Sequence, residues 1–481
     1  TKTSTNNGNV LKSDYTPSEL AELRENTKNN IQSNVQLVKM RLENLFMGRF
    51  PIMVQSKLCI LDGMSRHMRY SLGECKNDIG GYFIIDGKEK VIVPQEAFGD
   101  NMLNVYKDKD DKYLYSADIK SVSENVSKPV RHLSVKILAS TPTIPRHNIG
   151  VFIPNAGNKP IPLFVVFRAL GILSDKEIIS FCLLQENVPE DFAPFFEACV
   201  HDAANIVTQY DAVSYISMFV KGRSISRTMH TLADYFLPHV GETNYVEKAY
   251  HLGIIVQRLL SVATGKEPET ERDSYKHKRL MLIGPLMKGL FREYYAIQQK
   301  HIHKFFEYRY EFSKDEYSDL TDMIYRKYPE AFSVRHVEDG FRKAFKGNWG
   351  AYSHTKKVGI VQDMNRLSHN GMISHLRKTN LPMDASVKLV GPRVLHGSQW
   401  GIVDPIDTPD GGNIGLHKHL SIMTHVSTAL SREPMIEWLT GHVSLKMLKN
   451  MSPAVLKSLT KVFVNGYWVG CVADPHVTIQ T

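Results

Sequence analysis

The stretch Gly80-Gly81-Tyr82-Phe83-Ile84-Ile85-Asp86-Gly87-Lys88-Glu89-Lys90-Val91-Ile92-Val93 contains two apolar runs separated by an Asp-Gly pair. A tight primed turn needs positive φ at both central residues, and Asp-Gly adopts such a turn readily. The stretch therefore predicts an antiparallel hairpin with strands at 82–85 and 90–93. Residues 462–469 repeat this arrangement around Asn465-Gly466 and predict a second hairpin.

Helix start signals lie on both sides of the first hairpin. Thr16-Pro17-Ser18-Glu19 combines a capping residue, a proline at the first helical position and the Glu of a capping box, so we expect a helix from there to about Phe46. Ser174-Asp175-Lys176-Glu177 begins a second helix in the same way. Residues 244–264 carry a helical pattern that ends at Gly265, a residue suited to the left-handed backbone after a helix.

The remaining segments complete a mixed pattern of helices and strands. A long basic and aromatic helix is expected from about Pro285 to Phe312, and Ser313-Lys314-Asp315-Glu316 starts another. The apolar run 162–168 predicts a buried strand, whereas Gly and Pro interrupt residues 387–423 and predict irregular structure. Residues 1–14 are polar and predict a disordered tail. Because helices and strands come in mixed blocks without regular alternation, we expect an α+β fold with several domains.

Length and composition exclude several classes of protein. The 481 residues are 42% hydrophobic and 23% charged, which excludes a wholly disordered, collagen-like or disulfide-dense chain. The apolar run 162–167 is far too short to cross a bilayer and no secretory signal pattern is present, so we expect neither a membrane protein nor a secreted one. The five cysteines form no C-x-x-C pair, which favours reduced thiols in an intracellular protein over a zinc site.

Positive charge is concentrated in one part of the chain. The net charge is +9, from 59 Lys and Arg against 50 Asp and Glu. Residues 342–400, the basic window, contain ten Lys or Arg and only two acids, a net +8. Such a field favours a polyanion, although a solvated basic face is the common alternative. Trp349, Tyr352 and Trp400 lie in the same window, and nucleic acid is the polyanion it fits best, because Lys and Arg that neutralise phosphates release counterions.

Three carboxylates recur at a spacing of three in Asp404, Asp407 and Asp410. They could collect a hard cation, but the alternate acids and terminal Glu of an EF-hand loop are missing and two prolines stiffen the segment. A rigid turn whose acids cap backbone amides, a role near bound phosphates and an independent metal site are the alternatives. The sequence contains neither a P-loop nor an H-E-x-x-H zinc helix.

Beyond these general signals, the basic window resembles a known family. Four of its segments follow the order and spacing of the fork region in the second-largest subunit of multisubunit RNA polymerases, namely 374–380, 391–396, 400–401 and 408–416. Further segments resemble other parts of that subunit, namely 80–91, 167–172, 272–291, 347–350 and 462–470. The pattern is closer to eukaryotic, archaeal and large-DNA-virus subunits than to bacterial ones.

The resemblance implies a domain order. It places a protrusion at 1–97 and 285–344, a lobe at 98–284, a fork at 345–427 and the start of the external domains at 428–481. Members of the family are longer than this chain, and their later half holds the hybrid-binding core, the wall and a zinc-bearing clamp segment. A fragment, or the N-terminal piece of a naturally split subunit, is therefore implied, with Zn²⁺ confined to the missing C-terminal part.

The implied function is template-directed nucleotidyl transfer by a DNA-directed RNA polymerase, in which this chain forms part of the nucleic-acid cleft and the fork loops. The catalytic Mg²⁺ would be held mainly by the largest subunit, so we expect the isolated chain to be inactive. Implied partners are the largest and other polymerase subunits, the remainder of the second-largest subunit, template DNA, the RNA–DNA hybrid and nucleoside triphosphates. The implied location is the nucleus for a cellular protein, or a cytoplasmic viral factory or virion for a viral one.

The resemblance also assigns individual residues. Arg393 is expected nearest to the incoming triphosphate, because a guanidinium stays charged and binds phosphate in a bidentate manner, and Asp410 is expected to orient it. Eight residues are expected to line the hybrid or the downstream fork. They are Lys356, Lys357, Arg366, Arg377, Lys378, Lys388, Arg393 and His396.

The sequence departs from the family pattern in places. Asp404 stands where Cys is usual, Asp407 and Asp410 stand where Glu is usual, and the divergent loop 381–387 retains only the following Lys388. Two other functions are weighed beside the polymerase. One is a stand-alone nucleic-acid-binding module, and the other is a metal-dependent hydrolase built on the three aspartates.

Overall fold

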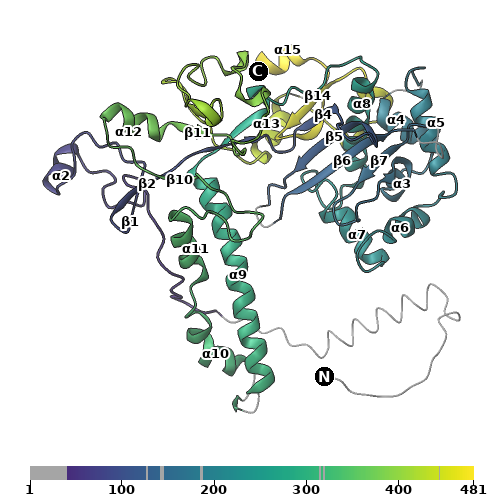
Figure 1. Cartoon of the computed structure of the whole chain (residues 1–481). Helices are drawn as coiled ribbons and strands as arrows, with labels where there is room; N and C mark the ends of the chain where they lie inside the picture. The colour runs from purple at the N-terminus through teal and green to yellow at the C-terminus, as the bar shows by residue number, and fades with distance from the viewer. Residues whose placement is uncertain are drawn as a thin grey trace. The chain divides into compact units, whose positions relative to one another are not determined.

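The structure, a computed structural model, describes residues 41–125, 128–140, 146–184, 188–313, 316–317, 320–443 and 445–480. The predicted tail 1–14 and the capping box at 16–19 lie outside these residues. The described chain forms two compact units (Figure 1). The smaller unit comprises the described residues up to Ile92 with Gly284–Met364, and the larger unit comprises Val93–Ile283 with the described residues from Asn365 onward. Both contain helices and a sheet, so the predicted α+β class is confirmed.

A five-stranded antiparallel sheet forms the frame of the larger unit. Its strands are neighbours in chain order, namely β4 (Leu103–Lys107), β5 (Tyr113–Ser121), β6 (Arg131–Leu138), β7 (Ile149–Phe152) and β8 (Ile161–Pro162). Leu133, Val135 and Ile137 alternate along β6 and are almost completely buried, whereas the residues between them are half-exposed. This period of two is the pattern of a sheet with one covered face.

Six described helices follow the sheet in sequence. They are α3 (Leu163–Ala169), α4 (Asp175–Leu183), α5 (Ala193–Asp202), α6 (Gln209–Ser217), α7 (Ile225–Asp234) and α8 (Tyr245–Ala263). The predicted start of α4 after Ser174 is confirmed, and so is the end of α8 before Gly265, whose φ is +74°. None of the described helices is both long enough and apolar enough to cross a membrane.

The prediction of a strand at 162–168 is wrong. The chain pairs with the sheet only through β8 and then enters α3, in which every residue is buried. A short run that is apolar on all sides has no period, so it does not distinguish a buried strand from a buried helix. Arg168 explains how a helix with a charged residue fits there, because its guanidinium donates to the carbonyls of Ala203 and Ile206 and pairs with Asp175.

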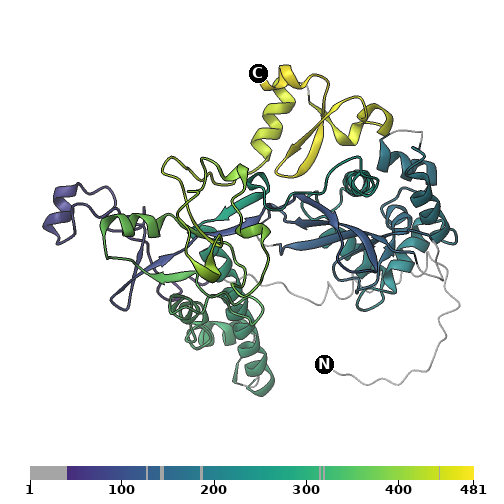
Figure 2. The same ribbon diagram turned by 45° about the horizontal axis from the view of Figure 1, so that its top comes forward.

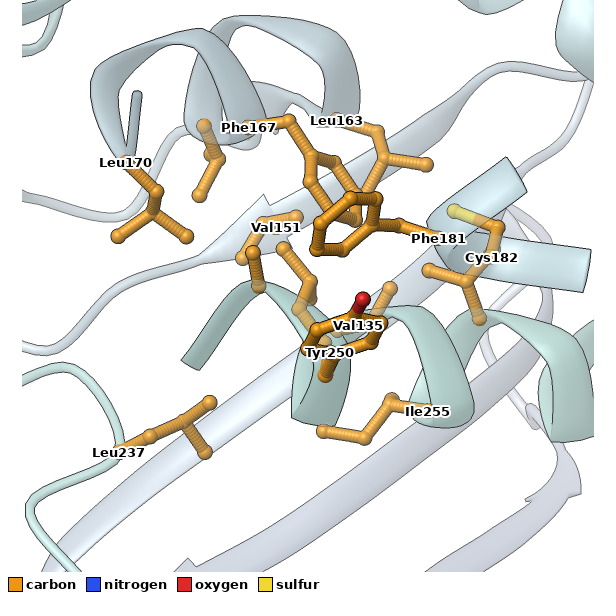
Figure 3. Packing of buried hydrophobic residues seen from close by; sticks show 14 of the residues in the cluster. Val135, Val151, Leu163, Phe167, Leu170, Phe181, Cys182, Leu237, Tyr250 and Ile255 are labelled. Carbon is orange, nitrogen blue, oxygen red and sulfur yellow. The ribbon is translucent and has the colours of Figure 1, made fainter. Parts of the chain in front are cut away.

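Helices and sheet meet in one hydrophobic core (Figure 3). Phe181 of α4 and Tyr250 of α8 stack with ring centroids 4.2 Å apart at its centre. Trp468, from a segment more than two hundred residues later, packs edge-on against Tyr250 with ring centroids 5.7 Å apart. The C-terminal segment therefore shares its core with the five-stranded sheet.

That C-terminal segment, yellow in Figure 2, carries its own small sheet. The strand order is β13–β15–β14, and the elements are α13 (Glu433–His442), β13 (Lys446–Met447), η6 (Leu448–Asn450), α14 (Pro453–Leu456), β14 (Thr460–Val464), β15 (Tyr467–Val472) and α15 (Pro475–Gln480). Asn465 and Gly466 join β14 to β15 with φ of 51° and 79°, which confirms the predicted hairpin.

A four-stranded sheet of the larger unit collects strands from distant parts of the sequence. Its order is β12–β11–β3–β9, with β3 at Gln95–Phe98, β9 at Lys278–Met281, β11 at Lys378–Asn380 and β12 at His417–His419. Helix α12 (His369–Leu376) leads into β11. Between β11 and β12 the described chain contains three short 3₁₀ turns, η3 (Gly391–Arg393), η4 (Gly397–Gln399) and η5 (Gly411–Asn413), which confirms the predicted irregular stretch.

The smaller unit contains a three-stranded sheet and a set of helices. Its elements are α2 (Arg66–Ser71), β1 (Phe83–Ile85), β2 (Lys88–Ile92), α9 (Ile283–Phe312), α10 (Leu320–Ala331), α11 (His336–Phe345) and β10 (Val361–Asp363). The predicted hairpin is confirmed, since Asp86 and Gly87 take φ of 49° and 76° between β1 and β2. The predicted long helix is α9, and α11 runs beside it in Figure 1.

One predicted helix boundary in this unit is wrong. Residues 41–46 are not helical, and Asn44 interrupts them with a left-handed φ of 56°, a conformation that Asn tolerates. The predicted helix start at 313–316 lies partly outside the described residues. The amide of Ser313 donates to the carbonyl of Arg309 at 2.9 Å, and the amide of Glu316, which lies in a 3₁₀ turn, donates to the carbonyl of Ser313 at 3.2 Å. Helix α10 begins at Leu320.

Two buried histidines make the larger unit sensitive to acid. His239 and His251 are 2% and 6% exposed and their ring centroids lie 4.7 Å apart. Burial lowers the pKa of His251 to about 4, and burial followed by the charge of His251 keeps the pKa of His239 well below its usual value. Both histidines thus take up protons at a lower pH in the folded state than in the unfolded state. Their contribution to the free energy of unfolding is therefore fully present above pH 6.5 and is lost as the pH falls towards 4.

We expect the His251 contribution to reach about 3 kcal/mol at pH 4. Urea unfolding of the wild type and of His251→Gln at pH 7.5, 5.5 and 4.5 measures it. The free energy of unfolding of the variant should fall less steeply with acid than that of the wild type. Parallel pH profiles would show that His251 does not titrate on unfolding.

Candidate nucleic-acid interface

The basic window is divided between the two units. Lys356 and Lys357 belong to the smaller unit and are exposed, and the backbone of Lys357 is anchored to buried Trp349 by an N–O hydrogen bond of 2.7 Å. Neither ammonium group forms an ion pair with an acid in the described part of the chain. The other predicted contacts belong to the larger unit, so each basic surface has to be considered by itself.

In the larger unit, the predicted cations differ in what they contact. Arg377 donates from Nη2 to the carbonyl of Ser421, and its own carbonyl accepts from the amide of Leu420 at 3.0 Å. Arg366 places Nη1 2.7 Å from the sulfur of Met372. Lys388 is exposed and pairs with no acid among the described residues, so its ammonium group is open to a phosphate.

The Arg393 guanidinium clamps two loops together. Nη1 donates to the carbonyls of Gly412 and Ile414 at 2.5 and 3.1 Å. Nη2 donates to the carbonyls of Ala385 and Val387 at 2.9 and 3.1 Å. The contact with a triphosphate stays a prediction. A single contact can use Nε–H, which has no acceptor among the described residues, whereas a bidentate contact requires the guanidinium to exchange at least one carbonyl oxygen for a phosphate oxygen.

The turn beside Arg393 is held by Thr408 and Gly415. The Thr408 hydroxyl accepts from the Gly415 amide at 2.9 Å and donates to the carbonyl of His417 at 2.9 Å. Gly415 has φ +69°, and an added Cβ would lie 2.3 Å from the carbonyl oxygen of Arg393, so only glycine fits there. Asp410 is exposed and forms no ion pair with Arg393 among the described residues, so its predicted orienting role stays a prediction.

The three aspartates do not converge on one point. Asp404 accepts from the amides of Ile406 and Asp407 at 2.9 and 3.1 Å, and these hydrogen bonds lower its pKa. Asp407 instead lies 3.2 Å from Nδ1 of His419. Within the described ranges, no group of three or more His, Cys, Asp or Glu side chains could hold a metal ion. Asp404 therefore caps backbone amides of its own turn, as one of the three alternatives predicts.

His396 fastens η4 to a neighbouring 3₁₀ turn, η1 (Tyr275–His277). Its Nε2 lies 2.6 Å from Oε1 of Glu271, and its Nδ1 lies 2.6 Å from the Ser398 hydroxyl. That hydroxyl in turn accepts from the amide of Tyr275 at 2.8 Å. The predicted contact of His396 with nucleic acid stays a prediction, because both ring nitrogens already have partners.

A buried ionic network in the four-stranded sheet was not predicted. Glu96 of β3 receives Lys418 of β12 at 3.0 and 3.2 Å, Lys278 of β9 at 3.2 Å and the Tyr275 hydroxyl at 2.6 Å. Burial favours the neutral acid, but the two ammonium groups outweigh it and hold the pKa of Glu96 below its usual value. No local motif could reveal this network, because Glu96 and Lys418 are 322 residues apart.

The opposite face of the same strands carries a second cluster that sequence reasoning missed. β11 and β12 are antiparallel, with Lys378 opposite His419 and Asn380 opposite His417. Side chains directly opposite in a ladder share a face, so these four point away from the buried Lys418. The spacing of His417 and His419, two residues apart in a strand, was the available signal.

Two protein-family models match the chain. The family model described as RNA polymerase beta subunit matches residues 12–324, and the model described as RNA polymerase Rpb2, domain 3, matches residues 362–426. The chain is 35% identical to the DNA-directed RNA polymerase II subunit RPB2 of Encephalitozoon cuniculi, over 90% of this chain and 37% of that protein.

Two further relatives come from Arabidopsis thaliana. DNA-directed RNA polymerase II subunit 2 is 34% identical over 91% of this chain and 37% of that protein, and DNA-directed RNA polymerase III subunit 2 is 30% identical over 82% and 33%. The chain thus spans little more than a third of the length of these relatives. On these matches the chain belongs to the RNA polymerase beta subunit family, that of the second-largest subunits of DNA-directed RNA polymerases.

Proposed function

We propose that this chain works within a DNA-directed RNA polymerase, where it forms part of the surface that holds nucleic acid during template-directed RNA synthesis. The supporting observation is that Lys356, Lys357 and Lys388 of the basic window are exposed and lack an acidic partner among the described residues. Such lysines can neutralise phosphates without first breaking an ion pair.

The proposed reaction transfers a nucleotide from a nucleoside triphosphate to the growing RNA and releases pyrophosphate. Mg²⁺ would be held mainly by the largest subunit and would stabilise the charge that develops on the transferred phosphoryl group. The residues of this chain would contribute positive charge and the positioning of the fork. For Arg393 we propose contact with the incoming triphosphate, and for Asp410 an orienting role.

The proposed partners are the largest and other polymerase subunits, the remainder of the second-largest subunit, template DNA and the RNA–DNA hybrid. The proposed location is the nucleus in a cell, or a cytoplasmic factory or virion in a virus. The domain order proposed is protrusion at 1–97 and 285–344, lobe at 98–284, fork at 345–427 and external domains from 428. The match to the domain 3 model, at 362–426, falls inside the proposed fork.

Affinity purification of the tagged full chain from its native host tests the proposal. A largest-subunit partner should co-purify in equal amount, and the purified assembly should extend RNA on a DNA template when Mg²⁺ is supplied. Recovery of the chain alone with tight nucleic-acid binding would support the stand-alone module instead. Metal-dependent hydrolysis by the chain alone would support the hydrolase.

We expect the exposed lysines to contribute to the salt dependence of nucleic-acid binding. Replacing Lys356 and Lys357 by Ala should lower the slope of log affinity against log salt by about 0.9 for each lost phosphate contact. The measurement is the affinity of the assembled enzyme for a template–RNA scaffold at several salt concentrations between about 50 and 200 mM.

The matched control replaces two exposed lysines outside the basic window, Lys109 and Lys112, by Ala. This control has the same loss of net charge and should leave the slope unchanged. Equal slopes for both double variants would show that Lys356 and Lys357 lie on a solvated face and contact no phosphate.

A further inference from the structure

Four basic side chains gather on one face of β11 and β12. Lys378 and His419 are directly opposite in the ladder. His417 comes two residues before His419 in β12, so its side chain is on the same side of the sheet. His375 comes from α12, which precedes β11, and the charges of both Lys378 and His419 act on its ring. The same two charges act on the ring of His417, so the four side chains form one electrostatic cluster, the His–Lys cluster.

The negative charge near this cluster is already in use. Asp407 is the carboxylate that acts on Lys378, but its Oδ2 lies 3.2 Å from His419 Nδ1 and 3.4 Å from the Ser374 hydroxyl. The half-buried ammonium of Lys378 forms no hydrogen bond or ion pair with a described residue. Burial lowers the pKa of Lys378, as expected for an ammonium group without a close counter-charge.

Two imidazoles of the cluster also have unused capacity. Nδ1 of His417 is buried and has no hydrogen-bond partner among the described residues. His419 directs Nδ1 to Asp407, whose carbonyl lies 3.0 Å away, which leaves Nε2 for another group. His375 differs, because its Nδ1 accepts from the amide of Asn365 at 3.1 Å. A group rich in hydrogen-bond acceptors would satisfy Lys378, His417 and His419 together.

We propose that Lys378, His417 and His419, with His375 beside them, form a phosphate-binding site whose affinity rises as His375 and His417 take up protons. For its ligand the site rests on the proposed function, since nucleic acid and nucleoside triphosphates both present phosphate. A phosphate carries only acceptor oxygens, so it can satisfy the ammonium group and each protonated ring at once.

The direction of the pH effect follows from the charges around the rings. Burial, then Lys378, then His419 lower the pKa of both His375 and His417, so these two rings are harder to protonate in the free site than in an unperturbed histidine. A bound phosphate opposes those terms and draws protons onto the rings. Asp407 and Asp404 carry the negative charge that acts on His419, while Glu96 and Lys418 face the other side of the sheet and are paired with each other. Average uptake of about a third to a half of a proton between pH 8 and pH 6 should make phosphate bind roughly five- to tenfold more tightly at pH 6 than at pH 8.

Binding of a fluorescent RNA–DNA hybrid, ATP and inorganic tripolyphosphate to the full chain tests the site at pH 6 and pH 8. The hybrid is the main probe for pH, because its phosphodiesters do not titrate in this range. For the other two ligands the comparison is between variants at one pH, so that the ligand's own titration cancels. His417→Asn should weaken binding less at pH 8 than at pH 6, where it should lose most of the gain. Lys378→Gln should weaken binding at both pH values, and His476→Asn, which changes an exposed histidine outside the cluster, should behave as wild type.

The three ligands distinguish the source of the phosphate. If the hybrid competes with tripolyphosphate, the site binds the nucleic-acid backbone. If only ATP competes with tripolyphosphate, the site binds the nucleotide. Both outcomes support the site. Hybrid binding that depends on Lys356 and Lys357 but is unchanged by His417→Asn and Lys378→Gln would overturn the site and leave the proposed function intact. If the variants change the affinity for tripolyphosphate but the chain does not bind the hybrid, the result supports the site and counts against the proposed function. A chain that binds none of the three ligands would overturn the site.

Discussion

Replacing Glu96 by Gln should lower the free energy of unfolding of the larger unit by about 3–5 kcal/mol, the cost of leaving buried charges unpaired. The side chain of Glu96 is 1% exposed, and those of Lys418 and Lys278 are 6% and 9% exposed. Gln keeps the size and one carbonyl oxygen but removes the charge that both ammonium groups face. Urea unfolding at pH 7.5, followed by circular dichroism, measures the change.

A surface pair provides the matched control. Asp100 and Lys120 lie 2.6 Å apart with side chains 50% and 31% exposed, so Asp100→Asn should cost less than about 1 kcal/mol. Adding Lys418→Met to Glu96→Gln removes one of the two unpaired charges and should restore part of the loss. Equal losses for Glu96→Gln and Asp100→Asn would mean that water reaches the network.

Replacing Gly415 by Ala should cost about 2–5 kcal/mol, from backbone strain at positive φ together with overpacking. The new Cβ would meet three backbone atoms of Arg393 at 2.3–2.7 Å, and backbone can relieve this overlap only by moving. The movement would separate the Arg393 guanidinium from its carbonyl acceptors. Thermal unfolding, with amide exchange of the residues around η5, measures the effect.

Gly411 separates the two causes. It has φ +71°, close to the +69° of Gly415, but an added Cβ would meet no atom within 4 Å. Gly411→Ala should therefore cost only the strain of roughly 1–2 kcal/mol. Equal losses at both positions would show that the overlap with Arg393 is relieved without cost.

The elements that sequence predicted well are those whose signals are local. Asp86-Gly87 and Asn465-Gly466 specify their hairpins because the turn conformation depends on those two residues. Gly265 ends α8 for the same kind of reason. The prediction of a strand at 162–168 was wrong because the surroundings bury every side of this run, and such burial leaves no periodic pattern in the sequence.

Charge could be counted in the sequence, but its partners could not. The basic window reads as one continuous field, yet the boundary between the two units at Met364 divides it. Arg377 and Arg393 read as phosphate ligands, although in the structure they bind backbone carbonyls. The His–Lys cluster becomes visible only when the register of β11 against β12 is known, because that register decides which side chains share a face.

The four-stranded sheet has a consequence for the nascent chain. Strands β4 to β8 are complete once residue 162 has left the ribosome, but Glu96 must wait 322 residues for Lys418. At about 5–20 residues per second, that interval lasts roughly 15–60 s. During it the carboxylate cannot be buried with its full set of counter-charges, so the edge of β3 that later receives β11 stays open and accessible to chaperones. Slow synthesis at any position between Glu96 and Lys418 should therefore prolong the aggregation-prone stage of this protein, whereas slow synthesis before Glu96 should not.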